Sequence, residues 1–441
     1  MEPKAAPKAP EAKASLKLPT PGLSPKASPL GKLQVPGAAS PSRLSTSSTS
    51  SAWKGVRGSM FLGGLGRSNF FTEKQALVIS FGQAYTKVGL AGESRPRAIF
   101  RTPELRGRER KDSEADAEVT LPVPQEEWVQ ILDGLLNRIF FQYLHLSPKD
   151  RRIIVCESVY SSTQFRKALA FVLFKLFSAP SVCFVLELVL PLYLTGLHSG
   201  LVVDLGYDAA RVLPTFAGVP LLSAYSAAAC GVRRVLQGIK GALGSLSSEE
   251  RKALEDETVL EDVLVCACYV SCDFPEDSEF AASSFRTDKD AEVRLVGRDH
   301  GLRVPAACRD IGLFFKSDKD ATREDGCECE TLPEAFVRAL ELSPVDLRSQ
   351  LVQNIVVCGG AANLRGLLPR LALELQKALE DHKALGALAE KLRFTPVEFA
   401  PVSAAWTGGA IFGALEGVAD YSAEDFHKGE PLPDWLRSGF L

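Results

Sequence analysis

The chain has 441 residues, of which 46% are hydrophobic and 24% charged, and its formal net charge is −3. This length and apolar content suffice for a large buried core divided between two domains. The near balance of charge gives no whole-chain reason to expect nucleic-acid or membrane binding. Basic residues nevertheless gather at the start, where residues 1–70 hold ten Lys and Arg against two Glu.

Residues 1–70 are rich in Ala, Pro, Ser and Lys, a composition that cannot bury enough apolar surface to order the chain. We therefore predict a disordered basic tail without the apolar run of a signal peptide. A plain linker is the simpler interpretation, and a weak contact with an acidic partner is the alternative. Met60 would allow a shorter product that starts just before the folded region.

The first folded feature, after about Phe71, is an apolar hairpin. Residues 76–83 (Ala-Leu-Val-Ile-Ser-Phe-Gly-Gln) lead through a turn at Gly82 into a second apolar run that ends on Ala91-Gly92. The next predicted elements, in chain order, are a charged aperiodic stretch (95–118), an amphipathic helix (126–144), a turn (147–150), a buried strand (152–156), a helix (163–177), a strand (181–186) and a further helix that runs up to 193. Strands that alternate with helices predict an α/β sheet with parallel pairs.

The most hydrophobic stretch, residues 168–197, falls within this series. Two prolines and two charged side chains interrupt it, which is too many for a membrane span. We therefore expect a soluble protein with no membrane insertion.

A second hairpin, beginning at 201–208 (Leu-Val-Val-Asp-Leu-Gly-Tyr-Asp), repeats the first. Ser80 and Gly82 lie 124 residues before Asp204 and Gly206. The repeat predicts a fold made of two related halves. Facing hairpins could clamp a phosphate chain, because a Gly turn exposes backbone N–H groups and an Asp can hold a cation through water. An ordinary tight turn between core strands is the alternative.

Later elements are less regular. Helices are expected at 232–246, 249–269, 332–342 and 364–379, an acidic insertion with few strands at 273–331, and a strand at 354–360 that ends in Gly359-Gly360. The last recognisable element is 405–413 (Ala-Trp-Thr-Gly-Gly-Ala-Ile-Phe-Gly), whose small residues predict a helix packed tightly against its neighbours.

The ten cysteines lie mainly in apolar segments, as expected for reduced thiols of the cytosol or nucleus. The closest group is Cys266, Cys268 and Cys272, with Cys327 and Cys329 further along. This spacing matches no common zinc pattern, and no His pair lies nearby. We therefore expect no zinc site.

With these motifs in this order, the chain resembles actin and the actin-related proteins. The resemblance covers about residues 74–415 and rests on Gly82 to Gly92 with Lys87, on Leu192-Tyr193 to Gly206, on 357–360 and on 406–410. It implies an α/β, actin-like two-domain fold whose duplicated ribonuclease-H-like halves enclose a nucleotide cleft. The chain would then consist of a tail (1–70), a first half with a shortened pointed-end subdomain (71–200), a second half (201–420) and a C-terminal tail (421–441).

Within the family, the chain is most similar to the divergent class at the pointed end of dynactin. The residues that carry this are 148–158, 174–177, 204–207, 406–415 and 433–435. The resemblance implies a subunit of the cytoplasm and cytoskeleton. Its partners would be the actin-like filament subunits of dynactin, other pointed-end subunits and, indirectly, dynein, with no nucleic acid.

The resemblance also implies which residues bind nucleotide. They are Gly82, Gln83, Lys87, Asp204, Gly206, Gly359 and Gly360, with Asp204 holding Mg²⁺ through water. Other functional positions of the family depart from its pattern. The acid of the first hairpin is Ser80, the phosphate-binding Ser-Gly is Gln83-Ala84, and the Asp-Gly of the second hairpin is Tyr207-Asp208.

Three further departures concern hydrolysis and the nucleoside. The water-positioning Gln aligns with Glu187, the water-contacting His with Arg211, and a nucleoside-contacting Lys-Glu pair with Leu264-Val265. The loss of one positioned water or of one metal-organising carboxylate costs about 2–4 kcal/mol of transition-state stabilisation, by analogy with single-donor losses. We therefore expect ATP or ADP with Mg²⁺ bound without turnover, no catalytic residues and no enzyme activity; an empty or collapsed cleft is the alternative.

The segment between Gly92 and Leu192 is shorter than in the family, and residues 101–118 of it are mostly charged. A filament stops growing where a subunit presents a face that refuses the next one. The expected function is therefore a cap on the pointed end of dynactin's actin-like filament, in support of dynein-driven transport. The alternatives are a solvated loop without this consequence, a slow ATPase of the same superfold, and a nuclear subunit of a chromatin remodeller.

Overall fold

The computed structural model describes residues 74–103, 125–159, 161–243, 252, 254–272, 287, 289–294, 301–315, 329, 331–415 and 420–433, which all lie in one compact unit. The predicted tail at 1–70, most of the charged stretch at 101–118 and most of the insertion at 273–331 lie outside these residues. None of the described helices is long and apolar enough to cross a membrane.

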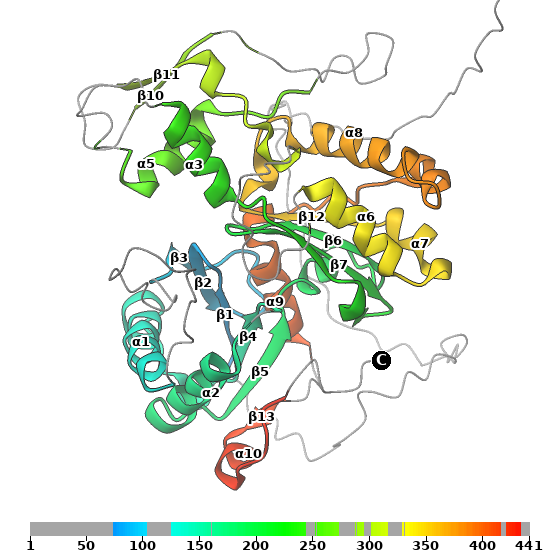
Figure 1. Ribbon diagram of the computed structural model, residues 1–441. Helices are drawn as coiled ribbons and strands as arrows, with labels where there is room; N and C mark the ends of the chain where they lie inside the picture. Colours follow the sequence, from blue (N-terminus) through cyan, green and yellow to red (C-terminus); the bar gives the residue numbers. More distant parts are fainter. Residues whose placement is uncertain are drawn as a thin grey trace, which may run out of the picture. The chain divides into compact units, whose positions relative to one another are not determined.

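The first sheet has six strands in the order β13-β5-β4-β1-β2-β3 (Figure 1). Their bounds are Leu77–Phe81 for β1, Tyr85–Leu90 for β2, Ala98–Arg101 for β3, Ile153–Glu157 for β4, Ser181–Leu186 for β5 and Tyr421–Ser422 for β13. Strand β1 is antiparallel to β2 and parallel to β4, which is parallel to β5. The predicted hairpin and the predicted α/β order are therefore confirmed.

Side chains of the first sheet alternate between two core clusters. Leu77 and Ile79 of β1 pack with helices α1 (Gln125–Asn137) and α2 (Thr163–Phe171), whereas Val78 between them packs with α9 (Ala404–Ala414). Both α1 and α2 continue into a π-helical turn, at Arg138–Tyr143 and Val172–Leu176. Both faces of this sheet are thus covered, as the near-continuous apolar strands require.

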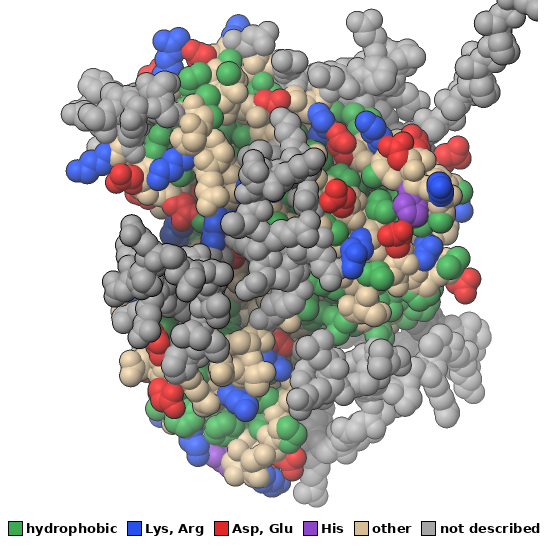
Figure 2. All heavy atoms as spheres, viewed as in Figure 1, with side chains coloured by type: hydrophobic (Ala, Val, Ile, Leu, Met, Phe, Trp, Pro, Cys, Tyr) green, Lys and Arg blue, Asp and Glu red, His purple; other side chains and the backbone are tan. Residues whose placement is uncertain are grey.

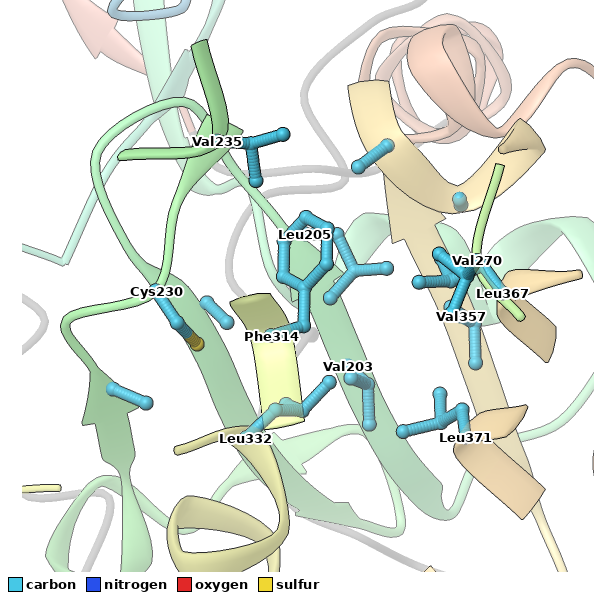
Figure 3. Packing of buried hydrophobic residues seen from close by; sticks show 14 of the residues in the cluster. Val203, Leu205, Cys230, Val235, Val270, Phe314, Leu332, Val357, Leu367 and Leu371 are labelled. Atoms are coloured by element: carbon cyan, nitrogen blue, oxygen red, sulfur yellow. The ribbon is translucent and has the colours of Figure 1, made fainter. Parts of the chain in front are cut away.

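The second sheet has the order β12-β6-β7-β8, and β9 pairs with β7. The bounds are Gly200–Leu205 for β6, Ala210–Phe216 for β7, Val219–Pro220 for β8, Ser226–Ala228 for β9 and Ile355–Gly359 for β12. Two clusters of buried hydrophobic residues include strands of this sheet. The larger contains Val203, Leu205 and Val357, which are drawn with Phe314 in Figure 3. Helices and strands around it are α3 (Val232–Ala242), α5 (Glu257–Ala267), β10 (Ala291–Arg294), β11 (Gly301–Val304), α6 (Leu332–Leu342), α7 (Val345–Val352) and α8 (Leu367–Glu380).

The predicted duplication is present in the register of the two hairpins. Ser80 pairs with Lys87 across β1 and β2, and Asp204 pairs with Arg211 across β6 and β7, so that the 124-residue offset holds for both members. In the parallel neighbours, Cys156 of β4 lies opposite Ser80, and Cys358 of β12 lies opposite Asp204.

Helix α9 packs as tightly as its small residues predict. Trp406 is fully buried and its Nε1 donates a hydrogen bond to the Val78 carbonyl at 3.0 Å. A Cβ atom on Gly408 would lie 2.1 Å from the Leu190 oxygen, so only glycine fits there. The predicted boundary at 420 places α9 in the second half, yet the helix covers the sheet of the first.

Residues 421–433, predicted as a tail, instead add structure to the first half. Strand β13 pairs with β5, and α10 (Ala423–Lys428) places Phe426 5.0 Å from Phe174, measured between ring centroids. A capping box between Ser422 and Asp425 begins α10. Elements this short have little sequence signal, because tertiary contacts stabilise them.

Three other expectations need correction. Strand β3 forms inside the stretch expected to be aperiodic, because it pairs with β2. The helix expected up to 193 is a 3₁₀ helix at Leu190–Leu194, with Pro191 in its first turn. Within the helix expected at 249–269, residue 252 is helical, but a turn at 254–256 interrupts the helix, and α5 begins at Glu257, where the Asp256 side chain caps it.

Candidate functional site

A cavity of about 280 Å³ lies between the two hairpins. It opens where the parallel strands end, since Ser158 follows β4, Glu187 follows β5, and Gly359 ends β12. Ligands of α/β sheets bind at this edge. The cavity is lined by every residue predicted to bind nucleotide, namely Gly82, Gln83, Lys87, Asp204, Gly206, Gly359 and Gly360. It is also lined by substituted positions, namely Ser80, Ala84, Glu187, Tyr207, Arg211, Leu264 and Val265.

Arg211 lies between the acidic side chains of the cavity. Its Nε donates to Asp204 Oδ2 at 3.0 Å, and its Nη2 forms an ion pair with the same oxygen. Its Nη1 contacts Glu187 Oε1 at 2.5 Å and Ser158 Oγ at 3.0 Å. Burial alone would lower the pKa of Arg211, but the carboxylates of Glu187 and Asp204 hold it well above its ordinary value.

Lys87 occupies the register position in the first hairpin that Arg211 occupies in the second. Its ammonium forms no ion pair within the described part of the chain, although Glu187 and Asp204 lie near enough to act on it electrostatically. Burial lowers the pKa of Lys87 against the pull of those two carboxylates. This side chain is therefore the cation best placed to meet an anionic ligand such as a phosphate.

The glycines of the cavity are explained mainly by close backbone approach. A Cβ on Gly82 would lie 2.6 Å from the Tyr85 oxygen, and one on Gly206 would lie 2.8 Å from the Ala209 oxygen. The Gly82 N–H already donates to the Tyr85 oxygen at 3.2 Å, so it is not free for a phosphate. A Cβ on Gly360, by contrast, would meet no atom within 4 Å.

Gly359 is required by its own packing. Its φ of 98° lies in the region that favours glycine, and a Cβ there would lie 2.4 Å from the Leu205 oxygen. The glycine pair therefore brings β12 against the second hairpin, with one glycine needed for contact and the other facing open space.

The cavity does not fit a hydrated Mg²⁺ at Asp204. One carboxylate oxygen accepts from Arg211, and the other lies 3.7 Å from the Cys358 thiol, which donates to it. Ser80 supplies no charge from the facing hairpin, and the described residues contain no group of three or more His, Cys, Asp or Glu that could hold a metal ion. Because Mg²⁺ needs carboxylate and water ligands, the metal role predicted for Asp204 does not fit this geometry.

A second polar cluster at the same cavity was missed from the sequence. We call Tyr85, Arg101, Glu257 and Glu261 the rim cluster. Arg101 forms ion pairs of 3.0 Å with both Glu257 and Glu261, and the Tyr85 hydroxyl donates to Glu261. Burial, followed by the Glu261 contact, raises the pKa of Tyr85 to about 12. The only sequence signal was the four-residue spacing of the two glutamates on one helix.

Tyr207 and Asp208, which replace the Asp-Gly of the family, are held by α3. The Arg233 guanidinium lies 5.0 Å from the Tyr207 ring centroid and forms a 2.9 Å ion pair with Asp208. The backbone N–H of Arg233 donates to the Tyr207 carbonyl at 2.8 Å.

Charges on the face shown in Figure 2 are interspersed over its described part, with no broad area of one sign.

Comparison with known proteins gives one family. The family model described as Actin matches residues 71–249 and 248–422. Actin-like protein 7A of Rattus norvegicus is 25% identical over 371 residues, 78% of either chain. The Homo sapiens protein of the same name is 25% identical over 390 residues, 82% of this chain and 83% of the relative. Actin-related protein 10 of Dictyostelium discoideum is 24% identical over 433 residues, 82% of this chain and 90% of the relative.

Proposed function

The chain belongs to the actin family, and we propose that it is a non-catalytic actin-related subunit that caps the pointed end of the actin-like filament in dynactin. The observation that supports the non-catalytic part is the position of Arg211, whose guanidinium pairs with Asp204 and Glu187. Hydrolysis would need a carboxylate that organises a metal and a neutral group that orients a water. In this chain the two positions are the carboxylates Asp204 and Glu187, and both form ion pairs with Arg211.

The proposed absence of turnover is supported by the free-energy cost expected for these substitutions. Ser80 lacks the charge of a metal-organising acid, and Glu187 is bound to Arg211 instead of orienting a water. Each loss removes about 2–4 kcal/mol of transition-state stabilisation, or a factor of ten for every 1.4 kcal/mol. Together they would abolish a slow ATPase.

Proteins of the actin family generally bind ATP or ADP with Mg²⁺. In this chain Lys87 offers a cation for a phosphate, and Gly360 faces open space in the same cavity. The proposal therefore retains a nucleotide that is bound without turnover, whereas its metal is the part that the cavity does not fit. Heat-denatured protein should release ATP or ADP in near-stoichiometric amount, and release of neither would contradict this part.

The capping role is supported by the similarity to an actin-related protein 10, together with the short, charged segment after β3. A head-to-tail filament ends where one face is competent and the other is not. The proposed partners are the actin-like filament subunits of dynactin and its other pointed-end subunits, with dynein as an indirect partner. The proposed location is the cytoplasm and cytoskeleton.

Affinity purification of the full chain, followed by mass spectrometry, tests the assembly. We expect dynactin subunits in near-stoichiometric amount; subunits of a chromatin remodeller would favour the nuclear alternative instead. A growth assay then tests the mechanism, with the purified chain added to preformed actin-like filaments. Substoichiometric arrest of pointed-end growth is expected, and incorporation along the filament would contradict capping.

A further inference from the structure

The floor of the cavity is crossed by one side chain that joins the two halves. Arg211 belongs to β7 of the second sheet, whereas its partners Glu187 and Ser158 follow strands of the first. Both acids that Arg211 neutralises, Asp204 and Glu187, are 8% exposed. A guanidinium keeps its charge at every physiological pH and has five fixed donors, so this bridge is permanently charged and directional.

The rim cluster forms a second bridge beside the same cavity. Tyr85 and Arg101 come from β2 and β3 of the first sheet, and Glu257 and Glu261 lie four residues apart on α5, beside the second. Tyr85 and Glu261 both line the cavity that Arg211 crosses. The cluster is partly exposed, with the Arg101 side chain at 35%, so solvent weakens it more than the floor bridge.

From these two bridges we infer that the chain closes its cleft with its own side chains, independently of nucleotide and divalent cation. Arg211 supplies, between Asp204 and Glu187, the positive charge that a metal ion would otherwise supply. The rim cluster ties the same halves together at a separate point. This inference goes beyond the proposed non-catalytic function, because a cleft that stays closed without nucleotide or metal is a property separate from turnover.

Alkylation of a buried thiol measures this closure. Cys358 lines the cavity, is 3% exposed and hydrogen-bonds Asp204, whereas Cys266 is exposed and serves as the internal control for the reagent. The full chain is treated with N-ethylmaleimide, either with ATP and Mg²⁺ or after apyrase and EDTA, and labelling is quantified for each cysteine by peptide mass spectrometry. The labelling rate of a buried thiol is set by how often the structure opens locally. If closure does not depend on nucleotide and metal, we expect the labelling rate of Cys358 to differ by less than about threefold between the two conditions. A larger rise after removal of nucleotide and metal would overturn the inference.

The variant Arg101→Gln tests the rim, with Lys428→Gln as its matched control. Lys428 loses the same charge from a fully surface pair with Glu424, away from the cavity. Arg101→Gln should raise Cys358 labelling by more than about threefold, with the control at the wild-type rate. Equal labelling of the two variants would overturn the role of the rim. Should Arg101→Gln fail to fold, Glu257→Gln removes one of the two ion pairs and serves the same comparison.

Phosphate release from ATP is measured on the same samples. Phosphate release with a Cys358 labelling rate that does not change on removal of nucleotide and metal would contradict the proposed lack of catalysis and leave closure standing. A rise in Cys358 labelling on their removal, without phosphate release, would overturn closure and leave the proposed lack of catalysis standing. The two ideas therefore fail separately.

Discussion

The two hairpins that line the cavity share one backbone pattern and differ in electrostatics. In the first hairpin, Ser80 faces Lys87, whose ammonium has no ion-pair partner among the described residues. In the second, Asp204 faces Arg211, which is bound to two carboxylates. One position in the register therefore carries an unpaired cation in one half and a neutralised one in the other.

The shared features are those that the backbone itself requires. At Gly82 and Gly206, an added Cβ would lie 2.6 and 2.8 Å, respectively, from the carbonyl oxygen three residues on. Cys156 and Cys358 occupy matching positions in the adjacent parallel strands. The duplication has thus kept turns and packing in both halves, while the charged side chains have diverged. Backbone geometry and cavity chemistry can be altered separately in this fold.

The largest expected effect is a difference in stability between two variants that carry the same substitution, to Met, at the equivalent positions Arg211 and Lys87. Arg211→Met leaves two nearly buried acids without their cation and should lower the free energy of unfolding by about 3–5 kcal/mol. Lys87→Met removes an unpaired, desolvated charge and should leave stability unchanged or slightly raised. Urea unfolding of both variants measures the difference. Equal losses would mean that the two hairpins are electrostatically alike.

A smaller effect is expected at the glycine pair that touches the second hairpin. Gly359→Ala must adopt a left-handed backbone beside the Leu205 oxygen and should cost about 1–3 kcal/mol. Gly360→Ala is the matched control, because a Cβ there meets nothing within 4 Å, and should change stability by less than about 0.5 kcal/mol. Thermal unfolding compares the two. If Gly360→Ala proved the more harmful, contact with the hairpin would not explain the pair.

The smallest effect concerns Tyr85, whose equivalent in the second hairpin is Ala209, so only the first hairpin reaches across from this position. Burial first, and then the Glu261 contact, raises the folded-state pKa of Tyr85 from 10.0 to about 12. Its contribution to stability is therefore fully present below about pH 10 and is lost as the pH rises through about 12.

Tyr85→Phe should remove this part of the alkaline loss while leaving the rest of the profile in place. Unfolding followed between pH 9 and 12 for the wild type and the variant measures it, and the difference between the two curves cancels the titration of other groups. Parallel curves would show that Tyr85 is not held by Glu261 in solution.

Much of the fold follows from local signals in the sequence. The helix at 332–342 and the strand at 181–186 were predicted with their observed bounds. The helix has a capping box between Thr331 and Glu334, and the strand is apolar from Val182 to its end at Leu186. The 124-residue repeat predicted that the two hairpins face each other, and residues of both line one cavity.

The features that escaped prediction depend on partners far apart in the chain. Arg101 and Glu257 are 156 residues apart, and Arg101 lies in a strand recognisable only by its pairing with β2. Arg211 was assigned as a substituted position, but its contacts with Glu187 and Ser158 depend on how the two sheets face each other, which periodicity does not specify. Strand β13 has two residues, and pairing with β5 alone defines it.

The return of α9 to the first sheet has a consequence for biosynthesis. Residues of β1 and β4 leave the ribosome early, yet the apolar face formed by Val78 and Ile154 is covered by Trp406, more than 250 residues later than Ile154. A nascent chain therefore carries this face exposed during most of its translation, which favours aggregation unless a chaperone shields it. The first sheet to be synthesised is among the last parts of the molecule to be completed.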